Sequence, residues 1–265
     1  MKIGFIGLGN MASAMIGGIL EKGIVKPEEI IGSARTKESV QKAARTFGIC
    51  AVEKNTEVAE QADILILSVK PQMYEQVIGE IRKGIKKDAL IISIAPGKTL
   101  KWLSELFGAS GNKLVRCMPN TPALVLEGCT GVCFSPELSE REKEAVMTVL
   151  GSFGKAIEIP EHLMDAVVGV SGSSPAYVFL FIEAMADAAV ADGMPRKQAY
   201  EFAAQAVYGS AKMVLETGKH PGELKDMVCS PGGTTIEAVR VLEETGFRSS
   251  VIEAQRACVA KSKNM

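Results

Sequence analysis

The sequence predicts an α/β domain, with a mostly parallel sheet and helices on both faces, followed by an all-α domain. Up to about residue 160, short apolar runs alternate with amphipathic stretches, a pattern typical of strands and the helices that cover them. After Pro160 no strand pattern remains and helical runs follow one another. We therefore expect one domain at 1–160 and a second at 161–265.

The strands expected in the first domain are short apolar runs with helical patterns between most of them, such as Thr36–Phe47 and Gln72–Lys83. Five runs have a clear strand pattern and two have a weaker one. The five are Lys2–Ile6, Ile30–Ser33, Asp63–Val69, Ala89–Ile94 and Lys113–Met118, and the weaker two are Cys129–Phe134 and Ala156–Ile159. Helices between consecutive strands allow parallel pairing, which needs long crossover connections.

Helices account for the whole second domain, with breaks at "SGSSP", "DGMP", "TGKHPG", "SPGG" and "TG". The expected helices are 161–170, 175–192, 196–217, 220–228, 234–245 and 247–262. The segment 175–191 has Glu183 and Asp187 as its only charges, and a helix that is apolar on most faces must be buried on most faces. A small helical domain cannot bury it alone, so we expect a homodimer.

Composition excludes several classes of function. With 30 basic and 31 acidic residues the net charge is −1, which gives no basic footprint for nucleic acid. The six cysteines form no C-x-x-C pair and there are two histidines, so the spacing of a zinc site is absent. No uninterrupted apolar run reaches the roughly 18 residues needed to span a membrane. These features favour a cytoplasmic protein with reduced thiols.

The first motif is a glycine-rich turn after the first strand. In "IGFIGLGNMA", Gly7, Gly9 and Ala12 occupy the positions of G-x-G-x-x-A, between a strand and a helical pattern. That context is typical of a Rossmann-like dinucleotide-binding domain, because the glycines let the backbone approach a pyrophosphate at the N-terminus of a helix. The residues expected to contact the cofactor are Ile6, Gly7, Leu8, Gly9, Asn10 and Met11.

The end of the second strand favours NADP(H) over NAD(H). An acidic residue there would bind the ribose 2′-hydroxyl of NAD, whereas this strand ends with Ser33, followed by Arg35, Thr36 and Lys37. Hydroxyl groups and cations suit a 2′-phosphate. The alternative is that Arg35 and Lys37 only begin a solvated helix. We therefore expect NADPH, with NADH as a second cofactor.

Two further strand ends are expected to line the cofactor, since ligands of parallel α/β sheets bind beyond the carboxyl ends of the strands. "ILILSVKPQ" places Val69, Lys70 and Pro71 at one such end. "SIAPG" places Ala95 at the end of the next strand, where small residues leave room for the nicotinamide ribose. In "RCMPNTP", Asn120 either faces the reacting ring or closes a turn between two prolines.

Taken in order, these motifs resemble those of pyrroline-5-carboxylate reductases, and the resemblance covers essentially the whole chain. It also includes "SGSSPAY" at 171–177 and "HPGELKDMVCSPGGTTIEAV" at 220–239, the most specific stretch. The resemblance implies reduction of 1-pyrroline-5-carboxylate to L-proline with NADPH or NADH. It also implies a helical dimerisation domain and dimers that assemble into larger rings. Asn55 matches a residue that contacts the adenosine side of the cofactor, with helix capping as the alternative.

The resemblance also assigns the substrate site. It places the substrate carboxylate at the turn "SPGGTT", with Ser230, Gly232, Gly233, Thr234 and Thr235 as contacts. The residues agree with this, because glycine N–H groups at a helix N-terminus favour an anion. Thr235 is expected to face the ring nitrogen and to act catalytically as an orienting hydrogen-bond donor.

Two other functions compete with imine reduction. One is a β-hydroxyacid dehydrogenase, which has a similar two-domain plan but takes a catalytic lysine from an early helix of its second domain. Helix 175–192 of this chain has no lysine. The other is a non-enzymatic NADP-binding scaffold, whose substrate turn would be damaged, whereas "SPGGTT" is intact.

Overall fold

The computed structural model describes residues 1–108 and 111–264, and its chain divides into two compact units. The first unit comprises Met1–Ser173 together with the C-terminal residues from Cys258 onward, and the second comprises Ser174–Ala257. The sequence-based boundary at Pro160 lies earlier and stays a prediction, because composition and packing are different criteria.

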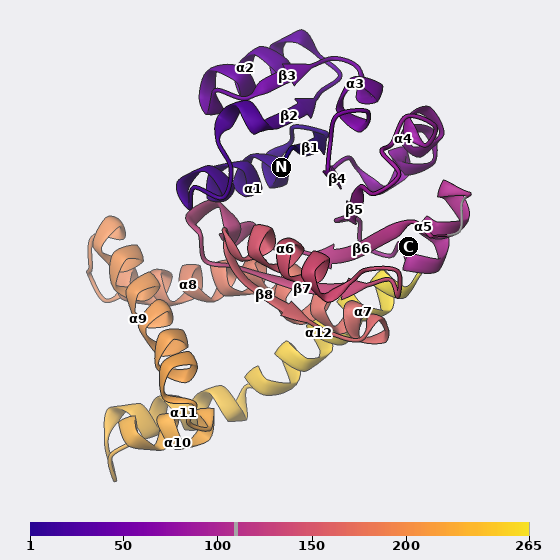
Figure 1. Cartoon of the computed structure of the whole chain (residues 1–265). Coiled ribbons are helices and arrows are strands. Elements are labelled where there is room, and N and C mark those ends of the chain that lie inside the picture. The colour runs from indigo at the N-terminus through magenta and orange to yellow at the C-terminus, as the bar shows by residue number, and fades with distance from the viewer. Residues whose placement is uncertain (109–110, 265) are drawn as a thin grey trace. The chain divides into compact units, whose positions relative to one another are not determined.

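In the described residues, the first unit is built on one sheet of eight strands in the order β3-β2-β1-β4-β5-β6-β7-β8 (Figure 1). All neighbouring strands are parallel except β6 and β7. This confirms the predicted mostly parallel sheet. The strands are β1 (Ile3–Ile6), β2 (Ile30–Ser33), β3 (Cys50–Val52), β4 (Ile64–Leu67), β5 (Leu90–Ser93), β6 (Lys113–Met118), β7 (Gly128–Phe134) and β8 (Gly154–Glu158).

The α-helices of this unit up to the last strand are α1 (Asn10–Glu21), α2 (Lys37–Phe47), α3 (Asn55–Ala59), α4 (Tyr74–Ile81), α5 (Leu100–Phe107) and α6 (Glu140–Gly151). Short 3₁₀ turns η1 (Pro27–Glu29), η2 (Pro71–Met73), η3 (Thr121–Val125) and η4 (Glu161–Leu163) join them. The chain then forms α7 (Met164–Val167) and the π-helical η5 (Val168–Gly172).

Two hydrophobic clusters lie on the two faces of the sheet. Residues that alternate along β4 show this most clearly: Ile64 and Ile66 belong to the cluster with α1 and α6, whereas Leu65 and Leu67 belong to the cluster with α3, α4 and α5. A strand covered on both faces is apolar at every position, which is why "ILIL" shows no polar alternation. Helices therefore cover both faces, as predicted.

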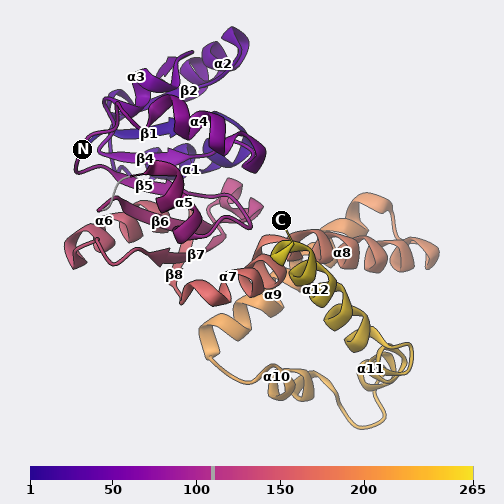
Figure 2. The ribbon, with the colours of Figure 1, turned by 90° about the vertical axis from the view of Figure 1, so that its right-hand side faces the viewer.

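The second unit is entirely helical in the described residues, with α8 (Ser174–Ala191), α9 (Arg196–Thr217), α10 (Pro221–Val228), α11 (Thr234–Glu244) and most of α12 (Phe247–Lys263) (Figure 2). Small side chains pack α8 against α9: Ala186, Ala199 and Ala203 are the residues of these helices that are buried. Helices α10 and α11 bury no residue. This unit therefore has little core of its own.

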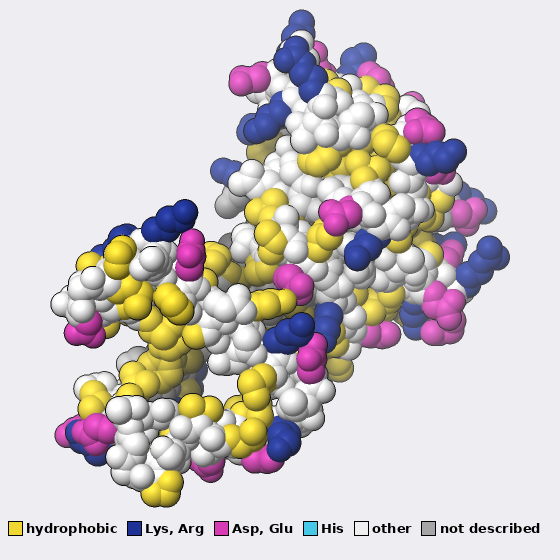
Figure 3. All heavy atoms as spheres, turned by 90° about the vertical axis from the view of Figure 1, so that its left-hand side faces the viewer, with side chains coloured by type: hydrophobic (Ala, Val, Ile, Leu, Met, Phe, Trp, Pro, Cys, Tyr) yellow, Lys and Arg dark blue, Asp and Glu magenta, His cyan; other side chains and the backbone are white. Residues whose placement is uncertain are grey.

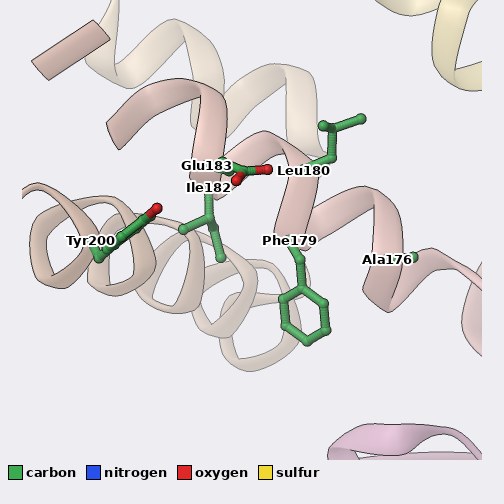
Figure 4. Close-up of a pocket in the computed structure, with 6 residues that line it drawn as sticks. All are labelled: Ala176, Phe179, Leu180, Ile182, Glu183 and Tyr200. Carbon is green, nitrogen blue, oxygen red and sulfur yellow. The ribbon is translucent and has the colours of Figure 1, made fainter. Parts of the chain in front are cut away.

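Large apolar side chains of the second unit lie on its surface (Figure 3). On α8, Phe179 is 63% exposed and Leu180 is 67% exposed, and Phe202 of α9 is 67% exposed. An open pocket of about 530 Å³ lies on this surface, and Figure 4 shows side chains of α8 and Tyr200 of α9 around it. Apolar surface of this extent is typical of a protein–protein interface.

One helical stretch of the described residues, Glu161–Ala191, is long and apolar enough to cross a membrane by length and composition. No such span was expected from the sequence, because polar residues interrupt the apolar run. The stretch consists of the short helices η4, α7 and η5 followed by α8, and 11% of its most apolar window is buried. The exposed apolar side chains of α9 to α12 extend the same type of surface beyond this stretch.

Candidate active site

The turn between β1 and α1 depends on the backbone conformation of Gly7 and on its close contacts with neighbouring strands. Gly7 has a φ of +99°, a conformation that favours glycine, and its N–H donates to the carbonyl of Ser33 at 3.0 Å. A Cβ atom on Gly7 would lie 2.9 Å from the Ser68 carbonyl oxygen, whereas a Cβ on Gly9 would meet nothing within 4 Å. Gly7 therefore shapes the turn, and Gly9 faces open space.

The N-terminus of α1 offers donors to a ligand. Gly9 is its N-cap residue and no side chain caps the helix. The first N–H groups of a helix have no partners within the helix, and the helix dipole makes this end positive. Ala12, the last position of the motif, is fully buried and packs the helix onto the sheet. The predicted residues Gly7, Leu8 and Gly9 therefore form the turn at the carboxyl end of β1, and Asn10 and Met11 begin α1.

Ser33 and Asn55, both predicted to contact the cofactor, lie together. The buried Ser33 hydroxyl donates to Asn55 Oδ1 at 2.8 Å, and Asn55 Nδ2 donates to Glu80 Oε2 at 2.8 Å. The N-cap residue of α3 is Lys54, so the side chain of Asn55 does not cap the helix. Both polar ends of the Asn55 side chain are engaged within the protein, which fixes its orientation.

The cations after β2 stay in solvent. Arg35 and Lys37 are exposed, and among the described residues neither side chain forms a hydrogen bond or ion pair. Thr36 is the N-cap of α2: its Oγ1 accepts from the N–H of Ser39 at 3.2 Å. Thr36 therefore has a structural role here, while the two neighbouring cations are available to an anion.

The carboxyl ends of β1 and β4 are joined at the point where the strand order reverses. The Ser68 hydroxyl donates to the carbonyls of Ile6 and Gly7, at 3.1 and 2.7 Å. Val69, Lys70 and Pro71 follow directly, and Pro71 begins η2 with Lys70 as its N-cap residue. The predicted residues Ile6, Val69, Lys70 and Pro71 thus lie at adjacent strand ends, at the switch point of the sheet. Ala95 follows β5, the next strand.

Asn120 closes a turn, the structural alternative of the two that the sequence left open. It is buried, and its Nδ2 donates to the carbonyl and hydroxyl of Ser171, both at 3.2 Å. Its Oδ1 accepts from the N–H of Cys129 at 2.8 Å. With its side-chain amide engaged at both ends, Asn120 joins β7 to the π-helical η5.

In the second unit, "SPGGTT" forms a tight turn before α11. Gly232 has a φ of +69°, and the N–H of Gly233 donates to the carbonyl of Ser230 at 3.0 Å. A Cβ atom on Gly233 would lie 2.4 Å from Ser230 Oγ and 3.1 Å from the Ser230 carbonyl oxygen, so a side chain here would displace the Ser230 hydroxyl. No side chain caps α11, whose N-cap residue is Gly233.

The turn therefore presents a set of donors, although one differs from expectation. Both glycine N–H groups were expected to face an anion, but the N–H of Gly233 is used within the turn. The donors that remain are the N–H of Gly232, the first N–H groups of α11, and the hydroxyls of Ser230, Thr234 and Thr235. These groups suit a carboxylate, because they are neutral donors at the positive end of a helix.

Neither histidine is placed as a catalytic base. His220 is the N-cap residue of α10, and its Nδ1 accepts from the N–H of Gly222 at 3.0 Å. His162 is exposed in η4. Among the described residues, no group of three or more His, Cys, Asp or Glu side chains could hold a metal ion. The chemistry available is thus binding and orientation by neutral donors.

Comparison with known proteins agrees with this arrangement. Residues 161–265 match the family model described as pyrroline-5-carboxylate reductase dimerisation, and residues 2–97 match that described as NADP oxidoreductase, coenzyme F420-dependent. The chain is 54% identical over 264 residues to the pyrroline-5-carboxylate reductase of Escherichia coli, and the match covers 100% of this chain and 98% of that relative. It is 43% identical over 264 residues to that of Methanosarcina acetivorans, covering 100% and 97%.

A solved structure is also similar over the full length. The crystal structure of Plasmodium falciparum pyrroline carboxylate reductase with NADP bound has a TM-score of 0.91 and 35% sequence identity, and the match covers 100% of this chain and 97% of that one.

Proposed function

Because this chain belongs to the pyrroline-5-carboxylate reductase family, we propose that its two glycine turns bind the two reactants, NAD(P)H at Gly7–Met11 and the imine at Ser230–Thr235. The enzyme is an NAD(P)H-dependent oxidoreductase that reduces the C=N bond of 1-pyrroline-5-carboxylate to L-proline, the last step of proline synthesis. The observation that carries this conclusion is the 54% identity over the whole chain, with the "SPGGTT" turn intact.

The first unit fits a dinucleotide. An uncapped helix N-terminus follows Gly9, and open space lies where a Cβ atom of that residue would be. We propose that the turn holds the pyrophosphate and that Asn55 and Arg35 lie on the adenosine side. The exposed guanidinium of Arg35 supports NADPH as the preferred cofactor, with NADH accepted. Val69–Pro71 and Ala95 would then line the nicotinamide end. When bound, the cofactor supplies the hydride.

The substrate carboxylate would bind at the donors of the second turn. Gly232, Ser230 and Thr234 surround the N-terminus of α11, where an anion is stabilised without a full positive charge. The donors of this site carry no charge, so they can bind the carboxylate while the imine nitrogen of the ring stays protonated. Protonation makes the C=N bond more electrophilic, so the protein has to orient the ring and needs no strong base.

Thr235 is proposed as the residue that acts on the ring nitrogen. It lies in the first turn of α11, one residue beyond Thr234, and its side chain is partly exposed. Its hydroxyl can donate a hydrogen bond or pass on a solvent proton. Loss of this hydroxyl should slow the reaction without abolishing it, because positioning supplies most of the rate.

Oligomerisation is a property of the family's helical domain, and this chain carries that domain at 161–265. We propose a homodimer whose partner covers the apolar side chains of α8, with dimers assembled further into a ring. The start of the family match at 161 supports a functional division between 1–160 and 161–265. We also propose that the enzyme is cytoplasmic and that it acts on neither nucleic acid nor membranes.

The competing functions have less support. A β-hydroxyacid dehydrogenase would take a lysine from α8, and α8 contains none. A non-enzymatic scaffold would tolerate damage to the substrate turn, but "SPGGTT" is intact and Gly232 has the positive φ that favours glycine.

One assay separates these functions. NADPH oxidation should depend on 1-pyrroline-5-carboxylate, and the product should be L-proline. The control reaction, 3-hydroxyisobutyrate with NADP⁺, should show no reduction of the cofactor. Activity in the control alone would identify a dehydrogenase, and NADPH binding without turnover in either reaction would identify a scaffold.

A further inference from the structure

The ends of β4 and β5 lie side by side and lead into the two segments that we assign to the nicotinamide end of the cofactor. Leu67 is paired with Ser93 in the register of the two strands. Val69–Pro71 follows the first strand, and Ala95 follows the second. The relative position of these two segments therefore depends on what joins the strand ends beyond the last ladder pair.

A buried chain of hydrogen bonds makes that connection. The Ala95 N–H donates to Ser93 Oγ at 3.4 Å, the Ser93 hydroxyl donates to Tyr74 Oη at 3.2 Å, and the Tyr74 hydroxyl donates to the Leu67 carbonyl at 2.7 Å. Tyr74 and Ser93 are both fully buried. All donors point in the same direction, an arrangement in which each bond strengthens the next.

We propose that Tyr74 and Ser93 are positioning residues that fix the ends of β4 and β5 relative to each other. They thereby determine the position in which the nicotinamide ring binds. The proposal rests on the proposed function, because it takes Val69–Pro71 and Ala95 as the nicotinamide contacts. Neither side chain touches the reactants. Both act through the backbone of the segments they join.

The hydroxyl of Tyr74 is suited to this role. Burial raises the pKa of Tyr74 well above its usual range, and this effect outweighs the opposing hydrogen bond from Ser93. The phenol therefore stays protonated and remains a donor to the Leu67 carbonyl at every working pH. The ring is held as well, since its centroid lies 6.3 Å from that of Trp102 on α5.

The adenosine side of the site is held by different contacts. Ser33 bonds to Asn55, and Gly7 bonds to Ser33, without using Tyr74 or Ser93. Breaking the chain should therefore leave most of the cofactor affinity intact and should impair hydride transfer. Misplacement of reacting groups by fractions of an ångström is enough to lower a rate substantially.

Tyr74→Phe and Ser93→Ala each break the series of hydrogen bonds while keeping a residue suited to the core. The kinetics of imine reduction with NADPH binding, and amide hydrogen exchange, are measured for each variant. Each variant should lower kcat for imine reduction about tenfold, with less than about a twofold change in the Kd for NADPH. In the enzyme without ligands, amide hydrogen exchange at 94–99 should become faster. The double variant should lose about as much kcat as either single one, because both break the same chain.

Ser152→Ala is the matched control, because it removes another buried hydroxyl, which donates to the Val149 carbonyl at 2.7 Å at the end of α6. It should lower the unfolding temperature with kcat unchanged. The proposal is overturned if Tyr74→Phe behaves in the same way, or if kcat falls without any change in exchange at 94–99. If the wild-type enzyme does not reduce the imine, the proposed function fails. Hydrogen exchange in the variants still shows whether the hydrogen bonds of Tyr74 and Ser93 restrain residues 94–99.

Discussion

The hydroxyl of Ser33 donates to Asn55 Oδ1 at 2.8 Å, which joins the end of β2 to the start of α3. The two residues are far apart in the sequence and were predicted to contact the cofactor for different reasons, Ser33 from its strand end and Asn55 from family resemblance. Their contact concentrates the adenosine side of the proposed site at one corner of the sheet. Arg35, two residues after Ser33, is an exposed cation that follows the same strand end.

Replacing Arg35 by aspartate should therefore weaken NADPH binding more than NADH binding. The change removes a partner for the 2′-phosphate and introduces a like charge, so the Kd for NADPH should rise roughly 10- to 100-fold. Binding of both cofactors is measured by fluorescence titration. Lys42→Asp, at an exposed position further along α2, controls for the change in net charge. Equal losses for the two cofactors would contradict the assignment.

Valine in place of Gly233 should abolish imine reduction while NADPH binding stays nearly unchanged. The added Cβ atom would lie 2.4 Å from Ser230 Oγ and 3.1 Å from the Ser230 carbonyl oxygen, so the Ser230 hydroxyl would be displaced from its place among the donors. Thr235→Ala should lower kcat more modestly. Gly151→Val, where a Cβ atom meets nothing within 4 Å, is the control for the same substitution. Normal activity in Gly233→Val would reduce the motif to a helix–helix turn.

Two inactive variants should restore activity when they are combined in one dimer. Gly9→Asp places a negative charge where a pyrophosphate would bind, and Gly233→Val disrupts the carboxylate site. If the active site is completed across the subunit interface, co-refolded hybrids regain part of the wild-type activity. Sedimentation should show a dimer or a multiple of dimers for each variant. An active monomer, or hybrids without activity, would show that each chain builds its own site.

The ion pair between Lys113 and Glu142 should make stability depend on pH in the acid range. Lys113 Nζ lies 2.6 Å from Glu142 Oε1, and hydrogen bonds from Lys113 and Ser139 lower the pKa of Glu142 to about 2. The contribution is fully present above the usual carboxyl pKa of about 4.3 and is lost as the pH falls through 2.

Glu142→Gln should therefore lower the unfolding temperature at pH 7, measured by circular dichroism. Between pH 4.5 and 2 the unfolding temperature of this variant should fall less than that of the wild-type protein. Glu140→Gln is the control, because Glu140 pairs with Lys143 while its side chain is 84% exposed. Its effect should be smaller, since exposed ion pairs contribute little. An equal pH dependence in the two variants would contradict the assignment.

Much of the first domain was predictable, because parallel strands buried on both faces appear as apolar runs. The five clearest runs correspond to β1, β2, β4, β5 and β6. The edge strand β3 escaped prediction because Cys50–Val52 is three residues long and partly exposed. The antiparallel pairing of β7 with β6 follows from the short connection between them, which cannot form a crossover.

The candidate site was predictable only in part. Glycine motifs are visible in a sequence because they require particular backbone conformations, as at Gly7 and Gly232. The role of Asn120 could not be settled, because its partners Ser171 and Cys129 come together only in the folded chain. The same holds for Tyr74, which the sequence shows only as an apolar position near the start of a helix.

The last helix crosses from one compact unit to the other, since the residues from Cys258 onward belong to the first unit. Ser262 is buried there and donates to Asp165 Oδ1 at 2.7 Å. The second unit is consequently an insertion tethered at two points. During synthesis on the ribosome, the first unit therefore stays incomplete until the whole helical insertion and the residues that follow it have emerged.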